Sequence, residues 1–192
     1  MFGTKLFRIR ALVEFGDVEA GELGGYVEKE SNLGHDDNAW VYDNAWVYGN
    51  ARVYGDAQVS GDARVYDNAW VYGDAQVSDD ARVYGNARVY GNAWVYGNAW
   101  VYGNALVCSD EDYAYAHGFG SVNRTTTFFR LKDGGVGVRC GCFYGTLAQF
   151  RDKIRETHGE TKKAQEYLML ADLMELRFEE DENEVGNRKY VE

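Results

Sequence analysis

The side chains that could carry acid–base or metal chemistry are few in this sequence of 192 residues, and they lie far apart. The three histidines are His35, His117 and His158. None of them predicts a nucleophile–base pair. A zinc site would need at least three clustered ligands, which this spacing does not supply. The sequence therefore predicts no catalytic residue, no metal site and no cofactor.

The three cysteines, Cys108, Cys140 and Cys142, do not predict a structural disulfide. Their number is odd, and the Cys140–Gly141–Cys142 segment is too tight for an ordinary bridge. On a strand these two thiols would share one face, but a zinc site would need a second Cys/His pair. Free thiols are typical of proteins in a reducing cytoplasm, and we expect that location here.

The chemistry that the sequence does favour is binding by arginine and aromatic side chains. Arginine and aromatic residues dominate binding hot spots, and an arginine above a ring can hold a carboxylate, a phosphate or the edge of another protein. Such residues recur every eighteen positions, in two neighbouring columns. The predicted binding residues are Trp46, Arg64, Arg82 and Trp100 in one column, and Tyr48, Tyr66, Tyr84 and Tyr102 in the other.

The two columns form only if a structural repeat places these residues above one another. From Asp37 to Cys108 the chain consists of twelve hexads of the form Gly/Asp–Asn/Asp–Ala–x–Val–Tyr/Ser, without insertion. On a pleated strand Ala and Val point to one side, while x and Tyr/Ser point to the other. Gly, Asp and Asn tolerate the backbone angles of a tight bend. Each hexad is therefore predicted to be a short strand followed by a corner.

The repeat also predicts how many hexads form one coil. Residues 55–72 and 73–90 differ at only three of eighteen positions, whereas a shift of twelve loses most outward identities. Such self-similarity is typical of a solenoid. We therefore predict a mainly β fold, a triangular parallel β-helix of about five coils with eighteen residues in each coil.

Three outer faces follow from three hexads in each coil. The second face carries the predicted binding residues named above. The first face has Trp40, Gln58, Gln76 and Trp94 at x, and Tyr42, Ser60, Ser78 and Tyr96 beside them. The third face has Arg52, Trp70, Arg88 and Leu106 at x, and Tyr54, Tyr72, Tyr90 and Cys108 beside them. All five tryptophans are thus expected to point outward.

The exposed aromatic columns have three interpretations: rings that stack along the helix, burial against another subunit, or a surface for a ligand or partner. Arg64 and Arg82 would start only ~4.8 Å apart on adjacent coils. Two charges that close repel unless an anion lies between them or aromatic neighbours separate them. If this face proved irrelevant, Arg139 and Lys153 of the C-terminal module would be the next residues to test.

We divide the chain into an N-terminal cap segment (residues 1–24), the β-helix (25–112) and an α+β C-terminal module (113–192). In the module, residues 125–131 and 136–143 are predicted to form a hairpin around the turn 132–135. Thr146 and Gln149 have capping-box spacing before a helix that ends at His158–Gly159. A second helix is predicted over residues 161–176, and the residues from 179 to 182 begin an acidic tail.

Charge and hydropathy exclude several classes of protein. The formal net charge is −11, spread evenly along the chain, which disfavours direct binding to nucleic acid but suits a basic groove on another protein. A solvated acidic surface is the simpler interpretation of the same charge. No stretch approaches the ~20 apolar residues of a membrane span, and residues 1–16 lack the apolar core of a secretory signal.

The hexad resembles the bacterial hexapeptide repeat, and this resemblance implies a left-handed triangular parallel β-helix. RIRALVEFGDVEAGELGGYVEKESNL (Arg8–Leu33) is similar to the segment that precedes the repeat in phage and prophage proteins of this type. These proteins are often labelled hypothetical, putative transferase or polymer-forming cytoskeletal protein. TTTFFRLKDGGVGVRCGCFYGTLAQFRDKIRETHG (Thr125–Gly159) resembles a C-terminal module carried by phages.

The resemblance also implies where an enzyme's residues would be. Hexapeptide-repeat acyltransferases typically use a histidine in a cleft between subunits, often with a loop inserted between coils. Here no loop interrupts the hexads and no histidine lies within them. His35 is the one histidine near an expected subunit cleft, and its simpler interpretation is a solvent-facing residue.

We therefore hypothesise a non-catalytic binding protein of phage type that forms a dimer or trimer in the bacterial cytoplasm. It would inhibit a host defence protein, for example a CRISPR or restriction nuclease, through an acidic, aromatic-rich rod. Two alternatives remain: a sponge for cyclic nucleotide signals at an oligomer cleft, and an acyltransferase with His35 as general base.

Overall fold

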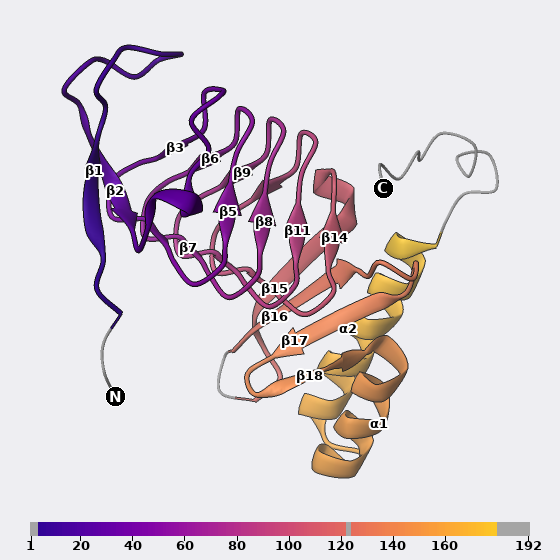
Figure 1. Ribbon diagram of the computed structural model, residues 1–192. Helices are drawn as coiled ribbons and strands as arrows, with labels where there is room; N and C mark the ends of the chain where they lie inside the picture. The colour runs from indigo at the N-terminus through magenta and orange to yellow at the C-terminus, as the bar shows by residue number, and fades with distance from the viewer. Residues whose placement is uncertain (1–3, 122–123, 180–192) are drawn as a thin grey trace.

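The computed structural model describes residues 4–121 and 124–179 and shows a β-solenoid followed by an α+β module (Figure 1). Three parallel sheets form the sides of the solenoid. The first face consists of β3 (Trp40–Val41), β6 (Gln58–Val59), β9 (Gln76–Val77) and β12 (Trp94–Val95). The second face consists of β4 (Trp46–Val47), β7 (Arg64–Val65), β10 (Arg82–Val83) and β13 (Trp100–Val101). The third face consists of β5 (Arg52–Val53), β8 (Trp70–Val71), β11 (Arg88–Val89) and β14 (Leu106–Val107).

The coils follow one another in steps of eighteen residues, as predicted. Trp46 is paired with Arg64, and Arg82 with Trp100, in parallel register. The backbone amide of Trp46 donates a 2.9 Å hydrogen bond to the carbonyl of Ala63 in the next coil. The fold prediction of a mainly β solenoid with about five coils is therefore confirmed. Its left-handed sense stays a prediction.

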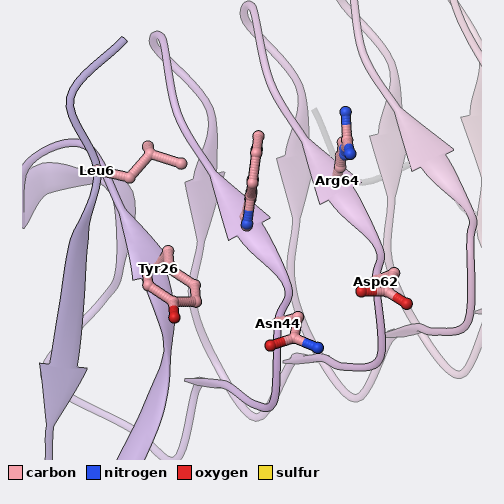
Figure 2. Close-up of a pocket in the computed structure, with 6 residues that line it drawn as sticks. Leu6, Tyr26, Asn44, Asp62 and Arg64 are labelled. Atoms are coloured by element: carbon pink, nitrogen blue, oxygen red, sulfur yellow. The ribbon is translucent and has the colours of Figure 1, made fainter.

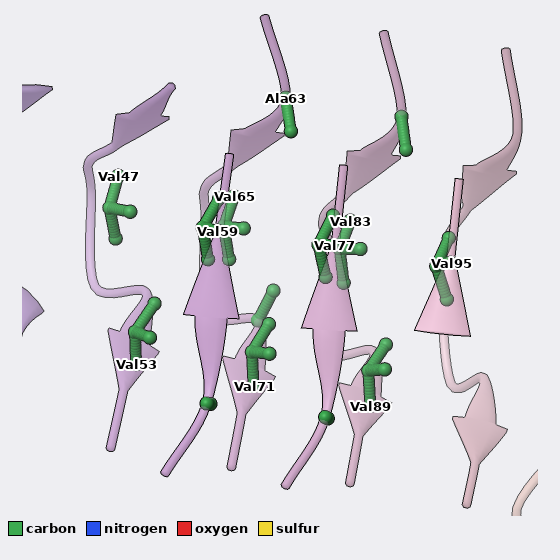
Figure 3. Close-up of a cluster of buried hydrophobic side chains, with 14 of the residues drawn as sticks. Val47, Val53, Val59, Ala63, Val65, Val71, Val77, Val83, Val89 and Val95 are labelled. Carbon is green, nitrogen blue, oxygen red and sulfur yellow. The ribbon is translucent and has the colours of Figure 1, made fainter. Parts of the chain in front are cut away.

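The interior of the solenoid is narrow and made of Ala and Val (Figure 3). Val47, Val65 and Val83 occupy equivalent positions in successive coils and are completely buried. Ala63 and Ala81, two residues before Val65 and Val83, are completely buried as well. Small inward side chains permit three strands to approach one axis closely. The prediction that the Ala and Val of each hexad point into the interior is confirmed.

Each coil turns a corner at the first residue of a hexad, in the left-handed backbone region. Gly55 has φ +71°, and a Cβ added there would lie 2.9 Å from the backbone nitrogen of Gly73 in the next coil. Asp43 occupies the equivalent region at another corner, with φ 52°. Between the second and third faces the corner also carries an amide ladder, in which successive side chains bond at 3.2–3.4 Å. The ladder consists of Asn50, Asn68, Asn86 and Asn104.

The N-terminal segment covers the first coil. β1 (Phe7–Arg10) pairs antiparallel with β2 (Leu23–Val27), which continues the second face next to β4, and the short 3-10 helix η1 (Glu30–Asn32) follows. Trp40 is only 4% exposed and meets Phe15 edge to face at 5.4 Å. Trp40 occupies an outward position of β3, as predicted, but the expected exposure of its ring is wrong because this segment folds over it.

The C-terminal module closes the other end of the solenoid. After η2 (Asp110–Asp112) its four antiparallel strands are β15 (Tyr113–Phe119), β16 (Arg124–Arg130), β17 (Val136–Cys140) and β18 (Phe143–Thr146). Successive residues of β16 face opposite sides: Phe129 joins the solenoid core, and Phe128 joins a second core under the helices. Both phenylalanines are fully buried, so one strand ties the two cores together.

The predicted hairpin is thus only the middle of a larger sheet. β15 forms where the hexad pattern decays, because Tyr113 and the residues after it find a partner strand in β16. The second predicted strand, residues 136–143, is broken at Gly141, whose φ is +58°. Cys142 consequently lies in the turn and is exposed, while Cys140 ends β17, so the two thiols do not share one face of a strand.

The two predicted helices are α1 (Leu147–His158) and α2 (Lys162–Phe178). The capping box is confirmed, since the amide of Gln149 donates to Thr146 Oγ1 and the Gln149 side chain accepts from the amide of Thr146. The predicted acidic tail lies outside the described residues from position 180 onward. Within the described part of the chain, no helix is long and apolar enough to cross a membrane.

A buried ion pair joins the solenoid end to the module. Arg130 Nε donates to Asp112 Oδ1 at 3.2 Å, and Arg130 Nη2 donates to the carbonyl of Phe178. The other oxygen of Asp112 accepts from the backbone amides of Cys108 and Ser109. The ion pair therefore links the last coil, β16 and the end of α2.

Asp112→Ala should destabilise the protein by about 3–5 kcal/mol, because it removes a buried carboxylate that pairs with Arg130 and accepts the amides of Cys108 and Ser109. The matched control is Asp172→Ala, which removes an exposed carboxylate partner of Arg151 and should cost less than about 1 kcal/mol. Urea unfolding followed by circular dichroism measures both effects. Equal losses in the two variants would contradict the role assigned to Asp112.

Candidate functional site: the second face

The structure brings the eight predicted binding residues together on the second face. Trp46, Arg64, Arg82 and Trp100 lie in register on adjacent strands, which are β4, β7, β10 and β13. Tyr48, Tyr66, Tyr84 and Tyr102 form the neighbouring column, two residues further along each coil. Whether this face binds a partner stays a prediction, but its geometry is now defined.

Each arginine of the column stacks on a tryptophan. The Arg64 guanidinium lies 4.5 Å from the ring centroid of Trp46, and that of Arg82 lies 4.7 Å from the ring centroid of Trp100. The two side chains therefore extend in opposite directions from adjacent strands. Attraction between a cation and the negative face of an indole ring thus separates the two like charges.

The tyrosines form a stacked column. The ring centroids of Tyr48 and Tyr66 are 5.0 Å apart with planes inclined by 2°, and those of Tyr66 and Tyr84 are 4.7 Å apart at 11°. Burial between its neighbours raises the pKa of Tyr66 far above the ordinary value of a tyrosine. For this column, stacking along the solenoid is the interaction that the structure shows.

The C-terminal module covers one end of the second face. Arg139 Nε donates a 3.0 Å hydrogen bond to the hydroxyl of Tyr84, and the guanidinium lies 5.5 Å from the Trp100 ring centroid. Tyr144 meets Tyr102 edge to face at 4.7 Å. Trp100, Tyr84 and Tyr102 therefore belong to the junction between solenoid and module, and Arg139 is a contact within this face.

The other end of the second face opens into a groove with a volume of about 520 Å³ (Figure 2). Residues of β2, β4 and β7 and of the segment before β1 contribute to it, with polar side chains from the neighbouring corner. The groove is lined by Leu6, Tyr26, Asn44, Trp46, Asp62 and Arg64. Trp46 and Arg64 are the two predicted binding residues that line it.

Sequence reasoning missed Tyr26 because the first coil departs from the repeat. Tyr26 pairs with Trp46, twenty positions later, so the eighteen-residue step does not reach it. Leu6 precedes β1 and carries no periodic signal at all. Asn44 and Asp62 occupy the corner position of the hexad, where they are expected only to favour a bend.

The histidines and Lys153 lie apart from this groove. His35 is exposed, 4.0 Å from Glu30, and His117 Nδ1 is 3.0 Å from Thr125 Oγ1 on β15 and β16. His158 ends α1, where Lys153 pairs with Glu156 on the surface. Across residues 4–121 and 124–179 no group of three His, Cys, Asp or Glu side chains could hold a metal ion.

The third face repeats the arrangement of cations and rings. Trp70 lies between Arg52 and Arg88, whose guanidinium groups are 5.8 and 5.1 Å from its ring centroid. The first face differs, since its central residues are glutamines and serines. On that face Trp94 Nε1 donates to Ser78 Oγ at 2.9 Å. Arginine–tryptophan stacking is therefore a property of two faces.

The coils, the parallel register and the outward columns define a β-solenoid repeat protein. A family model described as the YdcK beta solenoid repeat matches residues 45–59, 57–73, 75–87, 81–97 and 87–103, all within the regular coils. No curated protein matches the chain. The matches thus support a β-helix repeat protein and cover less than half of the sequence.

Alkaline pH should unfold the protein together with ionisation of the tyrosine column. Burial raises the pKa of Tyr48, Tyr66 and Tyr84 in the folded state above the ordinary value of 10.0. Stability present below pH 10 is therefore lost as the pH rises further, because the unfolded chain loses these protons first. Tyrosinate absorbance and circular dichroism should change together.

Tyr66→Phe should move this alkaline unfolding to higher pH, because phenylalanine keeps the stacked ring and cannot ionise. Circular dichroism of the variant and the parent chain across the alkaline range measures the shift. Complete tyrosinate formation near pH 10 in a chain that remains folded would contradict the assignment.

Proposed function

We propose that the protein is a non-catalytic binding protein that contacts a partner protein through the open end of the second face. The observation that carries this proposal is the difference between the two ends. At one end Arg139 and Tyr144 cover the column, whereas at the other the groove leaves Trp46 and Arg64 accessible. Tryptophan and arginine are the residue types on which binding energy concentrates.

The partner's chemistry is proposed from charge. The chain has a formal net charge of −11, and acidic residues line the corner beside the second face at Asp43, Asp62 and Asp80. An acidic rod is complementary to a basic groove such as the nucleic-acid channel of a nuclease, and such complementarity speeds association. The proposed partner is therefore a basic protein.

The biological setting is proposed from resemblance. The hexads resemble the bacterial hexapeptide repeat, and the segments around them resemble those of phage-borne proteins. On this basis the partner is a host defence protein, for example a CRISPR or restriction nuclease, and the protein acts in the cytoplasm of the infected bacterium.

Self-association is part of the proposal, and α2 supplies a surface for it. Met169, Leu173 and Leu176 are 71%, 54% and 68% exposed, and their spacing places them on one outward stripe of the helix. Lys162 lies at one end of α2 and Glu179 follows its other end. A second copy in antiparallel orientation would bring these opposite charges together while it buries the stripe.

Expression of the protein should raise phage plaque counts at least tenfold on a strain that carries one susceptible CRISPR or restriction system. Trp46→Ala should abolish this effect, since it removes the exposed ring of the groove. The control Trp94→Ala makes the same change on the first face and should retain it.

Unchanged plaque counts with every system tested would overturn the proposal. Saturable binding of a cyclic nucleotide in calorimetry would then favour the sponge. Release of thiol from acetyl-CoA that depends on His35 would favour the acyltransferase.

Light scattering at micromolar concentration should give a mass above the 21.7 kDa of one chain. Leu173→Asp should return the protein to that mass while circular dichroism stays unchanged, because a charge in the stripe opposes its burial. Phe7→Asp, which changes an exposed residue of β1, is the control and should leave the mass as it is. A mass of one chain for the parent protein would rule out the oligomer.

A further inference from the structure

The amide ladder at the corner between the second and third faces has a direction. At its first coil Lys29 Nζ donates a 3.1 Å hydrogen bond to Asn50 Oδ1. An ammonium group can only donate, so the oxygen of Asn50 faces Lys29 and its Nδ2 faces the next coil. Each following asparagine keeps this orientation, with Nδ2 donating to the Oδ1 of the next one as far as Asn104.

The ladder therefore ends in an amide donor. Asn104 Oδ1 accepts from Asn86 Nδ2 at 3.4 Å, and among the described residues the Nδ2 of Asn104 makes no hydrogen bond. Hydrogen-bonded amides that point in one direction polarise one another. The Asn104 end of the ladder consequently favours a group with negative charge.

Two cationic side chains lie beside this amide. The backbone amide of Lys132 donates to the carbonyl of Asn104 at 3.1 Å, which places Lys132 at the end of the ladder. Lys132, Asn104 and Arg88 line one cavity of about 390 Å³, and none of the described residues that line it is acidic. Within residues 4–121 and 124–179 neither Lys132 nor Arg88 forms an ion pair.

Arg88 stands between a ring and an aliphatic side chain. Its guanidinium lies 5.1 Å from the ring centroid of Trp70, close to the ~4.8 Å spacing of adjacent strands, so it extends outward above β11. On the other side β14 carries Leu106, which supplies neither a charge nor a ring. Contact with a ring leaves the N–H groups at the edge of a guanidinium available to a ligand.

We infer that this cavity on the third face is a binding site for a phosphate group. Asn104 Nδ2, Lys132 and Arg88 offer only hydrogen-bond donors, so they match oxygens that only accept. Two positive charges match the charge of about −2 that a phosphate monoester carries at pH 7, whereas a carboxylate carries a single charge. The site lies on another face than Trp46 and goes beyond the proposed partner contact.

The neighbouring carboxylates are held away from the cavity. Asp67 Oδ2 accepts from a backbone amide of the next coil at 3.3 Å, and Asp133 Oδ1 accepts from the amide two residues later at 3.1 Å. The other two corners carry aspartates at the hexad position that the ladder fills with asparagine, for example Asp62 and Asp74. An anion is therefore favoured at this corner alone among the three.

The test compares the peptide acetyl-Gly-phosphoserine-Gly-amide with its glutamate counterpart, which carries one negative charge less. Nuclear magnetic resonance of the 15N-labelled full chain follows the side-chain amide of Asn104 and the backbone amide of Lys132. The phosphoserine peptide should shift both signals in a saturable manner. The glutamate peptide should bind at least ~fivefold more weakly, because it offers one charge to two cations.

Two variants assign the site. Asn104→Asp keeps an oxygen for the amide of Asn86 and replaces the free donor with an anion, so it should abolish phosphate binding. Asn98→Asp is its matched control at the corner between the first and second faces. Lys132→Gln should weaken binding several-fold, and Lys153→Gln, which removes a charge from α1, should leave it unchanged.

Aspartate already occupies the hexad position of Asn104 elsewhere in the repeat, so Asn104→Asp should fold, and circular dichroism checks this. Equal binding of the phosphoserine and glutamate peptides, or unchanged binding in Asn104→Asp, would overturn the inference.

Glycerol phosphate, measured in the same way, distinguishes the two sources of a phosphate group. Both probes should bind if the inference is right. Tighter binding of the peptide assigns the site to a phosphorylated protein, and tighter binding of glycerol phosphate assigns it to a free phosphate ester. Trp46→Ala should bind both probes like the parent chain, so failure of the phosphate site and failure of the proposed function are distinguishable.

Discussion

The narrow interior of the solenoid is the constraint on which the rest of the structure depends. Its alanines and valines are completely buried, so every coil has to bring three strands to the same distance from one axis. Coils of equal shape can then stack with their backbone amides and carbonyls paired. Side chains at equivalent positions are consequently held in columns about 4.8 Å apart, whatever their type.

The outward columns show how the protein accommodates this enforced proximity. Equal rings stack, equal amides form a ladder, and equal charges diverge toward the nearest indole, as Arg64 and Arg82 do. The interactions that stabilise the faces therefore use most of the aromatic surface. How much aromatic surface remains available to a partner depends on the two ends of the solenoid, where the repeat stops.

The regular coils could be predicted from the sequence because their signal is repeated twelve times. The ends could not. Trp40 obeys the hexad pattern but is buried by a segment without any pattern, and Tyr26 faces the groove from a coil of different length. β15 forms through a partner strand rather than through local propensity. The groove at Trp46 combines regular and irregular residues, so Trp46 and Arg64 could be predicted, whereas Leu6 and Tyr26 could not.

The docking of Arg139 on Trp100 and Tyr84 fixes the module to one particular side of the solenoid. A duplication of eighteen residues would lengthen the rod by one coil and leave the module facing the same direction. An insertion of six or twelve residues would instead rotate the module onto another side of the solenoid. Arg139 would not find a ring and a hydroxyl there in the positions of Trp100 and Tyr84. Rod length in such a chain can therefore evolve in whole coils, while the direction in which its two ends point is conserved.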